Sequence, residues 1–180
     1  MRLGEAIRIG VALVLRAGWV PLSAFLLHVF ISRVVNGYIL YPPLDIPMHL
    51  FGGVAMAYFL ARCFAALPED AVSHSLRPLA EGVFVVSLTA TSSVLWEFAE
   101  FTSDAVFGTQ AQLGLDDTLL DMALGIAGAL SYVAMTWRLG ALGAVAPIRI
   151  RGRMNGRWVG ATSATLRHGR DPVGGPPKAP

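Results

Sequence analysis

The sequence predicts an all-α membrane protein, a bundle of about four transmembrane helices. Of its 180 residues, 54% are hydrophobic and only 14% are charged, and the mean hydropathy is +0.58. These values lie well outside the range of soluble domains. Long apolar runs alternate with short polar segments, and the basic residues gather in every second segment, as they do on the cytoplasmic side of membrane proteins.

The first apolar run predicts a helix over about residues 10–35. Its uncharged part is short for a hydrocarbon core of about 30 Å, so we expect Arg16 and Arg33 to lie near its ends with their charged groups at the interface. The pattern does not decide whether residues 1–35 form one helix or two segments. A basic start before apolar residues is also typical of a secretory signal, but Glu5 and Arg16 do not fit that pattern.

Three further apolar runs predict helices over about residues 46–67, 79–101 and 118–139. Pro47 fits the first turn of the second helix, where a missing N–H costs little, and Asp45 before it fits an N-cap. Small residues in these runs allow helix backbones to approach closely. The glycines concerned are Gly52, Gly53, Gly125 and Gly128.

The last part of the chain, residues 149–180, differs from the helical domain predicted over residues 1–148. It is rich in Gly, Pro and Arg, and we expect it to be a disordered basic tail. Membrane orientation and anionic lipid head groups account for its arginines, so the expected partners are membrane lipids and not nucleic acid. The single cysteine, Cys63, excludes an intramolecular disulfide. The sequence does not predict an oligomeric state.

The distribution of basic residues also predicts an orientation. Arg2 and Arg8 precede the first helix, Arg62 and Arg77 flank the second connection, and most of the remaining arginines follow the fourth helix. By the positive-inside rule these segments are cytoplasmic, which places both termini inside a bacterial inner membrane. The connections around residues 36–45 and 102–117 then lie outside.

Three predicted helix ends at that outer side each carry two side chains that can hold protons or ligate a metal. The pairs stand three or four residues apart, so each pair shares one face of its helix. They are Asp45 with His49, Glu97 with Glu100, and Asp117 with Asp121. Because acids inside a membrane are costly unless they are paired, protonated or metal-bound, we expect all six to face one interior site. Arg33 is the candidate counter-charge at that depth.

The chemistry of this cluster leaves three classes of function open. Carboxylates with one imidazole suit Mg²⁺, Mn²⁺ or Zn²⁺, and a metal enzyme acting on a lipid-linked envelope substrate could use Glu97, Glu100 or Asp121 as a general base. A transport or binding protein would use the acids for a cation or for protons. A structural protein would need the cluster only to lock its helices together.

The order of these motifs resembles the YjdF-like bacterial inner-membrane proteins and, more distantly, the VanZ-like family. The resemblance covers roughly residues 45–130. It rests on four motifs: Asp45-Ile-Pro-Met-His49, Trp96-Glu97-Phe-Ala-Glu100, Phe107-Gly-Thr-Gln110, and Asp117-Thr-Leu-Leu-Asp121-Met122 with Gly125 and Gly128. It implies a multi-helix membrane protein, and for VanZ-like members an association with glycopeptide resistance. This chain departs from the family in having fewer apparent helices at its N-terminus and no tryptophan directly before Asp117, so we do not carry over a resistance role.

Overall fold

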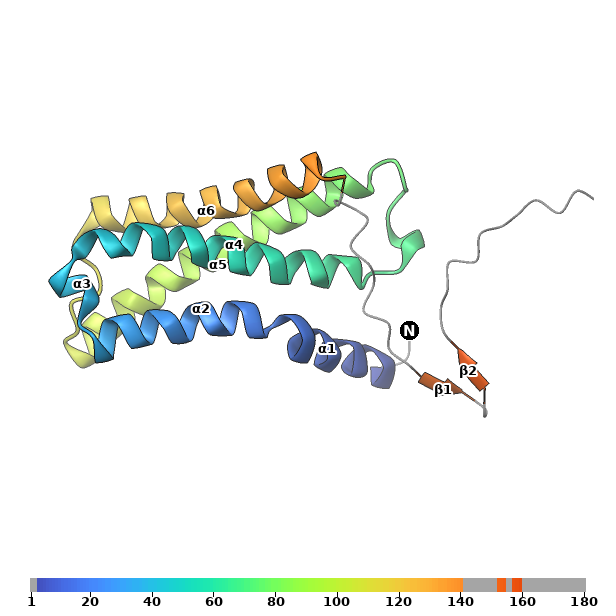
Figure 1. Cartoon of the computed structure of the whole chain (residues 1–180), viewed down its shortest axis with the longest axis horizontal. Helices are drawn as coiled ribbons and strands as arrows, with labels where there is room; N and C mark the ends of the chain where they lie inside the picture. The colour runs from blue at the N-terminus through green and yellow to red at the C-terminus, as the bar shows by residue number, and fades with distance from the viewer. Residues whose placement is uncertain (1–2, 141–151, 155–156, 160–180) are drawn as a thin grey trace, which may run out of the picture. The chain divides into compact units, whose positions relative to one another are not determined.

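A computed structural model of the chain describes residues 3–140, 152–154 and 157–159. These residues fall into two compact units, a helical one within residues 1–148 and a small one within residues 149–180. In the helical unit, successive long helices run in opposite directions along the same axis (Figure 1). The fold is all-α.

The first predicted helix is two segments, which answers the question left open by the sequence. Helix α1 spans Leu3–Ala17 and α2 spans Trp19–Val29, followed by a π-helical turn over Phe30–Val34. The axis bends by 50° at Gly18 between them. A Cβ on Gly18 would clash with the carbonyl group of Val14. The bend therefore requires a residue without a side chain at this position.

Three later helices are long and apolar enough to cross a membrane, and the bent pair α1–α2 makes a fourth span if it is counted as one. A short helix α3 (Gly37–Leu40) and a 3-10 turn (Pro42–Leu44) lead into α4 (Asp45–Ala65). Helix α5 covers Arg77–Phe107 and α6 covers Leu115–Arg138. This is the arrangement of a polytopic membrane bundle.

Two of the differences from the predicted helix boundaries bear on the site. Helix α5 continues past Phe101 to Phe107, because the polar residues after Phe101 stay helical and Gly108, with φ of 65°, ends the helix in the left-handed conformation that favours glycine. Asp45 is not an N-cap: α4 begins with Asp45 itself directly after the 3-10 turn, and no side chain caps this end. The Asp45 carboxylate is therefore free to face His49.

The helices pack through small residues. A Cβ on Gly53 of α4 would clash with the backbone of Gly125 on α6, and a Cβ on Gly128 would clash with the backbone of α4. A buried group of side chains from α4, α5 and α6 continues this contact away from the polar end: Ala57, Ala61, Val85 and Ala129. Gly52 differs from its neighbour, because a Cβ there would meet open space.

The C-terminal unit contains one short antiparallel ladder. Strand β1 (Gly152–Met154) pairs with β2 (Arg157–Val159), with Arg153 opposite Trp158. These two strands lie within residues 149–180, for which the composition predicts disorder, and the Asn-Gly pair between them in the sequence is a strong hairpin signal. The rest of the predicted tail lies outside the described residues.

Candidate functional site

Three of the six predicted site residues meet between α4 and α6. The Nε2 atom of His49 lies 3.3 Å from Oδ1 of Asp45 and 3.7 Å from Oδ2 of Asp121. One ligand atom from each residue can be chosen so that all three lie within 4.8 Å of one another. Asp45 and His49 stand one turn apart on α4, and Asp121 comes from the facing side of α6. We refer to these three residues as the triad.

The triad is withdrawn from solvent, Asp121 most of all. The exposed fraction is 4% for the Asp121 side chain, 11% for His49 and 29% for Asp45. The Oδ1 atom of Asp121 is fully buried and has no hydrogen-bond partner among the described residues. Buried carboxylate oxygens are normally hydrogen-bonded or bound to a cation, so this oxygen is the least satisfied group of the site.

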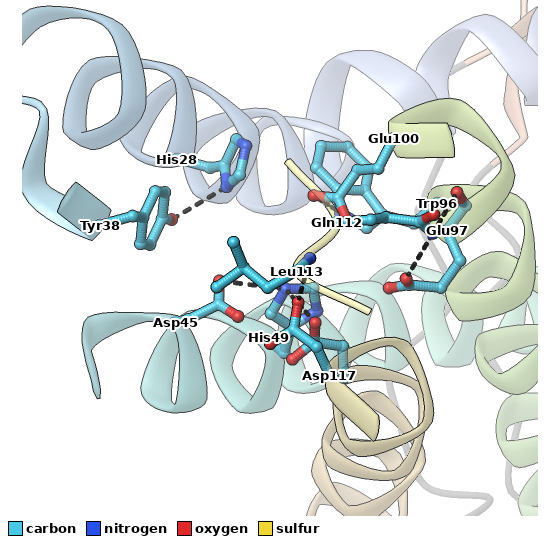
Figure 2. A network of polar contacts seen from close by, with 11 residues as sticks. His28, Tyr38, Asp45, His49, Trp96, Glu97, Glu100, Gln112, Leu113 and Asp117 are labelled. Carbon is cyan, nitrogen blue, oxygen red and sulfur yellow. Dashed lines mark hydrogen bonds and ion pairs between the residues drawn. The ribbon is translucent and has the colours of Figure 1, made fainter. Parts of the chain in front are cut away.

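Glu97 and Glu100, the pair on α5, are held by other residues. Glu97 is buried, and the side-chain amide of Gln112 donates to its carboxylate at 3.2 Å and to its backbone carbonyl at 3.1 Å. The indole Nε1 of Trp96 donates to Glu100 Oε1 at 2.9 Å. Figure 2 shows both carboxylates on the far side of the network from Asp45 and His49. They border the triad without joining its group of ligand atoms.

The connection between α5 and α6 is organised around Asp104. Its carboxylate accepts the hydroxyl of Thr109 and the backbone N–H groups of Ala111, at 2.9 Å, and Gln112, at 3.0 Å. These bonds close the short loop and place Gln112 against Glu97. Asp104 was not a candidate from the sequence, because a carboxylate in a polar segment is usually only solvated.

The remaining two sequence candidates stand at the edge of the site. The Asp117 carboxylate accepts the backbone N–H of Leu113 at 3.1 Å, so it fixes the entry to α6 (Figure 2). Arg33, the predicted counter-charge, lies in the π-helical turn after α2 and is exposed. Within the described part of the chain it forms no ion pair with any of the six candidates. The positive charge that the cluster needs is therefore not supplied by Arg33.

A second histidine that the sequence analysis missed lies beside the triad. The Tyr38 hydroxyl and His28 Nδ1 are 2.9 Å apart, and the rings of His28 and Trp96 are perpendicular, with 5.0 Å between their centroids. Tyr38 lies in α3, outside the spanning helices, and burial raises the pKa of its phenol. A histidine within an apolar run is itself a signal of function in membrane proteins, and that signal was available at His28.

A cavity of about 280 Å³ opens beside the triad. His28, His49 and Trp96 line one part of it, and Thr89 lines another. The Thr89 hydroxyl is fully buried and, like Asp121 Oδ1, has no hydrogen-bond partner among the described residues. The cavity and the triad thus share one residue, His49, and each contains a buried polar atom without a partner.

The match to a known family agrees with this architecture. Residues 11–141 match the model of a family described as "Predicted membrane protein (DUF2238)". The chain belongs to this family. All three residues of the triad, together with His28 and Trp96, lie within the matched segment, and the family's description agrees with the spanning helices. The protein is an integral membrane protein.

A relative from Thermotoga maritima, described as an uncharacterized protein, is 28% identical to this chain over 120 residues. The match covers 64% of this chain and 59% of the relative. The chain thus spans less than two thirds of that relative's length. No solved structure matches.

Proposed function

We propose that this DUF2238 protein binds a divalent metal ion at the triad formed by Asp45, His49 and Asp121. The observation that carries the proposal concerns Asp121, whose buried Oδ1 has no hydrogen-bond partner among the described residues and whose carboxylate lies beside two further possible ligands. Ligands bound to one ion at about 2.1 Å lie about 3.0 to 3.4 Å from each other. The distances of 3.3 and 3.7 Å from His49 Nε2 are close to that spacing.

The ligand set narrows the metals that suit the site. Mg²⁺ prefers oxygen ligands and keeps much of its water, whereas an imidazole with two carboxylates suits Zn²⁺ or Mn²⁺. Three protein ligands leave at least one coordination position for water or for a substrate. Such a site could polarise a phosphoryl or carbonyl oxygen, with Glu97 or Glu100 of the bordering pair as the candidate base.

A non-metal alternative has its own support in the same distances. A protonated His49 between two carboxylates would itself bridge α4 and α6, because its Nε2 faces both acids. In that case the triad binds a proton or locks the helices together, and no metal is needed. The two hypotheses predict different effects of Asp121→Asn, which replaces the carboxylate at position 121 with an amide.

We also propose that the triad faces the outside of a bacterial inner membrane, with both termini in the cytoplasm. The arginine distribution supports this orientation. The motif order from Asp45 to Gly128 supports a place among the YjdF-like proteins, with the VanZ-like family as a more distant relation. The basic tail would then contact anionic lipid head groups.

The test of the metal proposal is the thermal stability of the purified chain in detergent with and without Zn²⁺, Mn²⁺ or Mg²⁺. A ligand bound only by the folded state stabilises it by about 2.7 kcal/mol at a hundredfold excess over Kd. We expect this gain with Zn²⁺ or Mn²⁺ in the wild type, and its loss in Asp121→Asn because an amide is a poor metal ligand.

Asp116→Asn is the matched control, since Asp116 is an exposed aspartate on the same helix. It should keep the full metal response. A wild type that contains no metal by elemental analysis and gains no stability from any of the three ions would refute the metal site. That result would favour the alternative in which a protonated His49 bridges Asp45 and Asp121.

A further inference from the structure

The cavity beside the triad has one wall that carries hydroxyl groups. Helix α5 forms this wall with Thr89, Ser92, Ser93 and Trp96. These positions follow one another at intervals of one to three residues and share one face of the helix. Thr89 and Trp96 are about two turns apart, which is about 10 Å along the helix. The hydroxyl wall therefore runs along the cavity, and Thr89 lies at the end farther from the triad.

The walls that face α5 are mostly apolar. Phe25 lines the cavity from α2, and Met48 and Met56 line it from α4. No Asp, Glu, Lys or Arg is among the described residues that line the cavity. A charged group at the Thr89 end would therefore find no counter-charge, and burying an unpaired charge is costly. The cavity favours a ligand that is neutral and largely apolar.

The three hydroxyls of the α5 wall differ in the bonds that they can still form. Ser92 Oγ donates to the Leu88 carbonyl at 2.8 Å, and Ser93 Oγ donates to the Thr89 carbonyl at 3.2 Å. Each serine has thus used its only hydroxyl proton, and its oxygen can only accept further bonds. Thr89 is 1% exposed, and its hydroxyl has no partner among the described residues. Because a buried hydroxyl without a partner is costly, Thr89 needs a group that accepts its proton.

We propose that the cavity binds a small, neutral, largely apolar alcohol, with the hydroxyl of the alcohol at Thr89. One ligand hydroxyl can accept the Thr89 proton and donate its own proton to a serine oxygen one turn away, so a single atom answers both needs of the wall. The hydrocarbon part then covers the apolar walls. The volume of about 280 Å³ is near the lower end of ligand pockets, which suits a small molecule better than a diacyl lipid. No metal takes part in this binding, so the inference does not depend on the proposed function of the triad.

The test uses photoactivatable octanol in phosphatidylcholine vesicles that contain the full chain, with residue-level mass spectrometry of the products. A diazirine on the third carbon, near the hydroxyl, should label residues around Thr89 and Met56. A diazirine on the seventh carbon should instead label residues nearer Trp96. An octane that carries the same diazirine but no hydroxyl should label these positions several-fold less. Equal labelling by octane, or the reverse order of labelled positions, would overturn the placement of the hydroxyl. The absence of labelling by every probe would mean that the cavity holds only water, and would overturn the inference.

Variants at position 89 isolate the contribution of the hydroxyl. Thr89→Val keeps the shape of the side chain and removes its proton, so it should lower labelling by octanol about tenfold, a change of about 1.4 kcal/mol in binding. Labelling by octane should not change. Thr89→Ser restores a hydroxyl and should keep most of the octanol labelling. Thr91→Val is the matched control, since Thr91 is exposed on the same helix and its hydroxyl donates to the Ser87 carbonyl. Equal octanol labelling of Thr89→Val and wild type would contradict the proposal.

Two further measurements do not depend on the labelling at position 89. Gly52 lines the cavity, and a Cβ on Gly52 meets no atom within 4 Å, so Gly52→Leu should fill the space and lower labelling by octanol and octane alike. Gly10→Leu is its control, since Gly10 is exposed on α1 and a Cβ there also meets nothing. Without any alcohol, Thr89→Val should raise the melting temperature in detergent, because it removes a buried hydroxyl that lacks a partner. A lower melting temperature would show that this hydroxyl is already bonded in the free protein, and unchanged labelling of Gly52→Leu would show that the probe binds elsewhere. Either result would overturn the inference.

Discussion

Gly53 of α4 and Gly125 of α6 bring two helix backbones into contact one turn from the triad. His49 precedes Gly53 by one turn, and Asp121 precedes Gly125 by one turn. A side chain on Gly53 would meet the Gly125 carbonyl group. The close approach of the two backbones therefore sets the distance between His49 and Asp121.

The contact between Gly53 and Gly125 predicts that adding a single methyl group at position 53 lowers stability. Gly53→Ala should lower the free energy of unfolding by about 1 to 3 kcal/mol, because the helices must move apart to accept the methyl group. Gly52→Ala is the control and should be neutral or slightly stabilising, since its Cβ meets open space. The measurement is thermal unfolding in one detergent. Equal losses in the two variants would contradict the packing argument.

The hydrogen bonds that Asp104 accepts predict how well the loop after α5 is protected from amide exchange. Asp104→Ala removes the acceptor of the Ala111 and Gln112 N–H groups, so both amides should exchange with solvent faster. Hydrogen–deuterium exchange followed by mass spectrometry measures this. Ala105→Ser, at an exposed neighbour on the same helix, should leave the exchange unchanged. Unaltered protection in Asp104→Ala would show that the loop is held by other contacts.

The bond between Tyr38 and His28 predicts a dependence on alkaline pH. Burial raises the folded-state pKa of Tyr38 above the ordinary value of about 10. The resulting stabilisation is complete below the unfolded-state pKa and is lost as the pH rises toward the folded-state pKa. Tyr38→Phe should remove this dependence. It should also lower stability near neutral pH by about 0.5 to 1.5 kcal/mol, the range for one hydrogen bond.

An ultraviolet titration of tyrosinate in the wild type and in Tyr38→Phe isolates the phenol of Tyr38 from the other tyrosines. Tyr41→Phe is the comparison variant, because Tyr41 is exposed. The difference between wild type and Tyr38→Phe should contain a phenol that ionises only above the ordinary range. A Tyr38 that ionises with the exposed tyrosines would contradict the burial argument.

The proposed orientation predicts which connections reach a reagent outside the cell. In a Cys63→Ser background, Gln110→Cys should react with a membrane-impermeant maleimide in intact cells. Asp70→Cys should react only after the membrane is opened. Both positions are exposed, so the difference reports the side of the membrane and not burial. The reverse pattern would place the triad on the cytoplasmic side.

The fold followed from the sequence to a large extent, because apolar length is a strong signal and helices in a bilayer must satisfy their own backbone bonds. The pairing of Asp45 with His49 followed from their i,i+4 spacing. The end of α5 did not follow from the sequence. Aspartate is typical of loops, and the bonds that Asp104 accepts from the backbone of Ala111 and Gln112 are visible only in the structure. The polar residues after Phe101 indicate where the chain reaches the membrane interface, whereas the helix itself ends at Gly108.

The composition of the site was harder to predict than its location. The sequence grouped six residues, and the structure brings three of them together as possible ligands. Glu97 contacts Gln112 instead, and this partner could not be predicted because it lies in the loop after α5, outside the periodic pattern of the helix. His28 was missed because it stands alone in an apolar run, and its partners Tyr38 and Trp96 come from other elements.

The exposed position of Arg33 has a consequence for the valence of any ion at the triad. Asp45 and Asp121 carry one negative charge each when ionised, and a neutral His49 adds none. With Arg33 not paired with them, an ion of charge +2 makes the group electroneutral, whereas a monovalent ion leaves a net charge in a medium that solvates charge poorly. Discrimination between Na⁺ and a divalent ion would then come from charge balance and not from the size of the site.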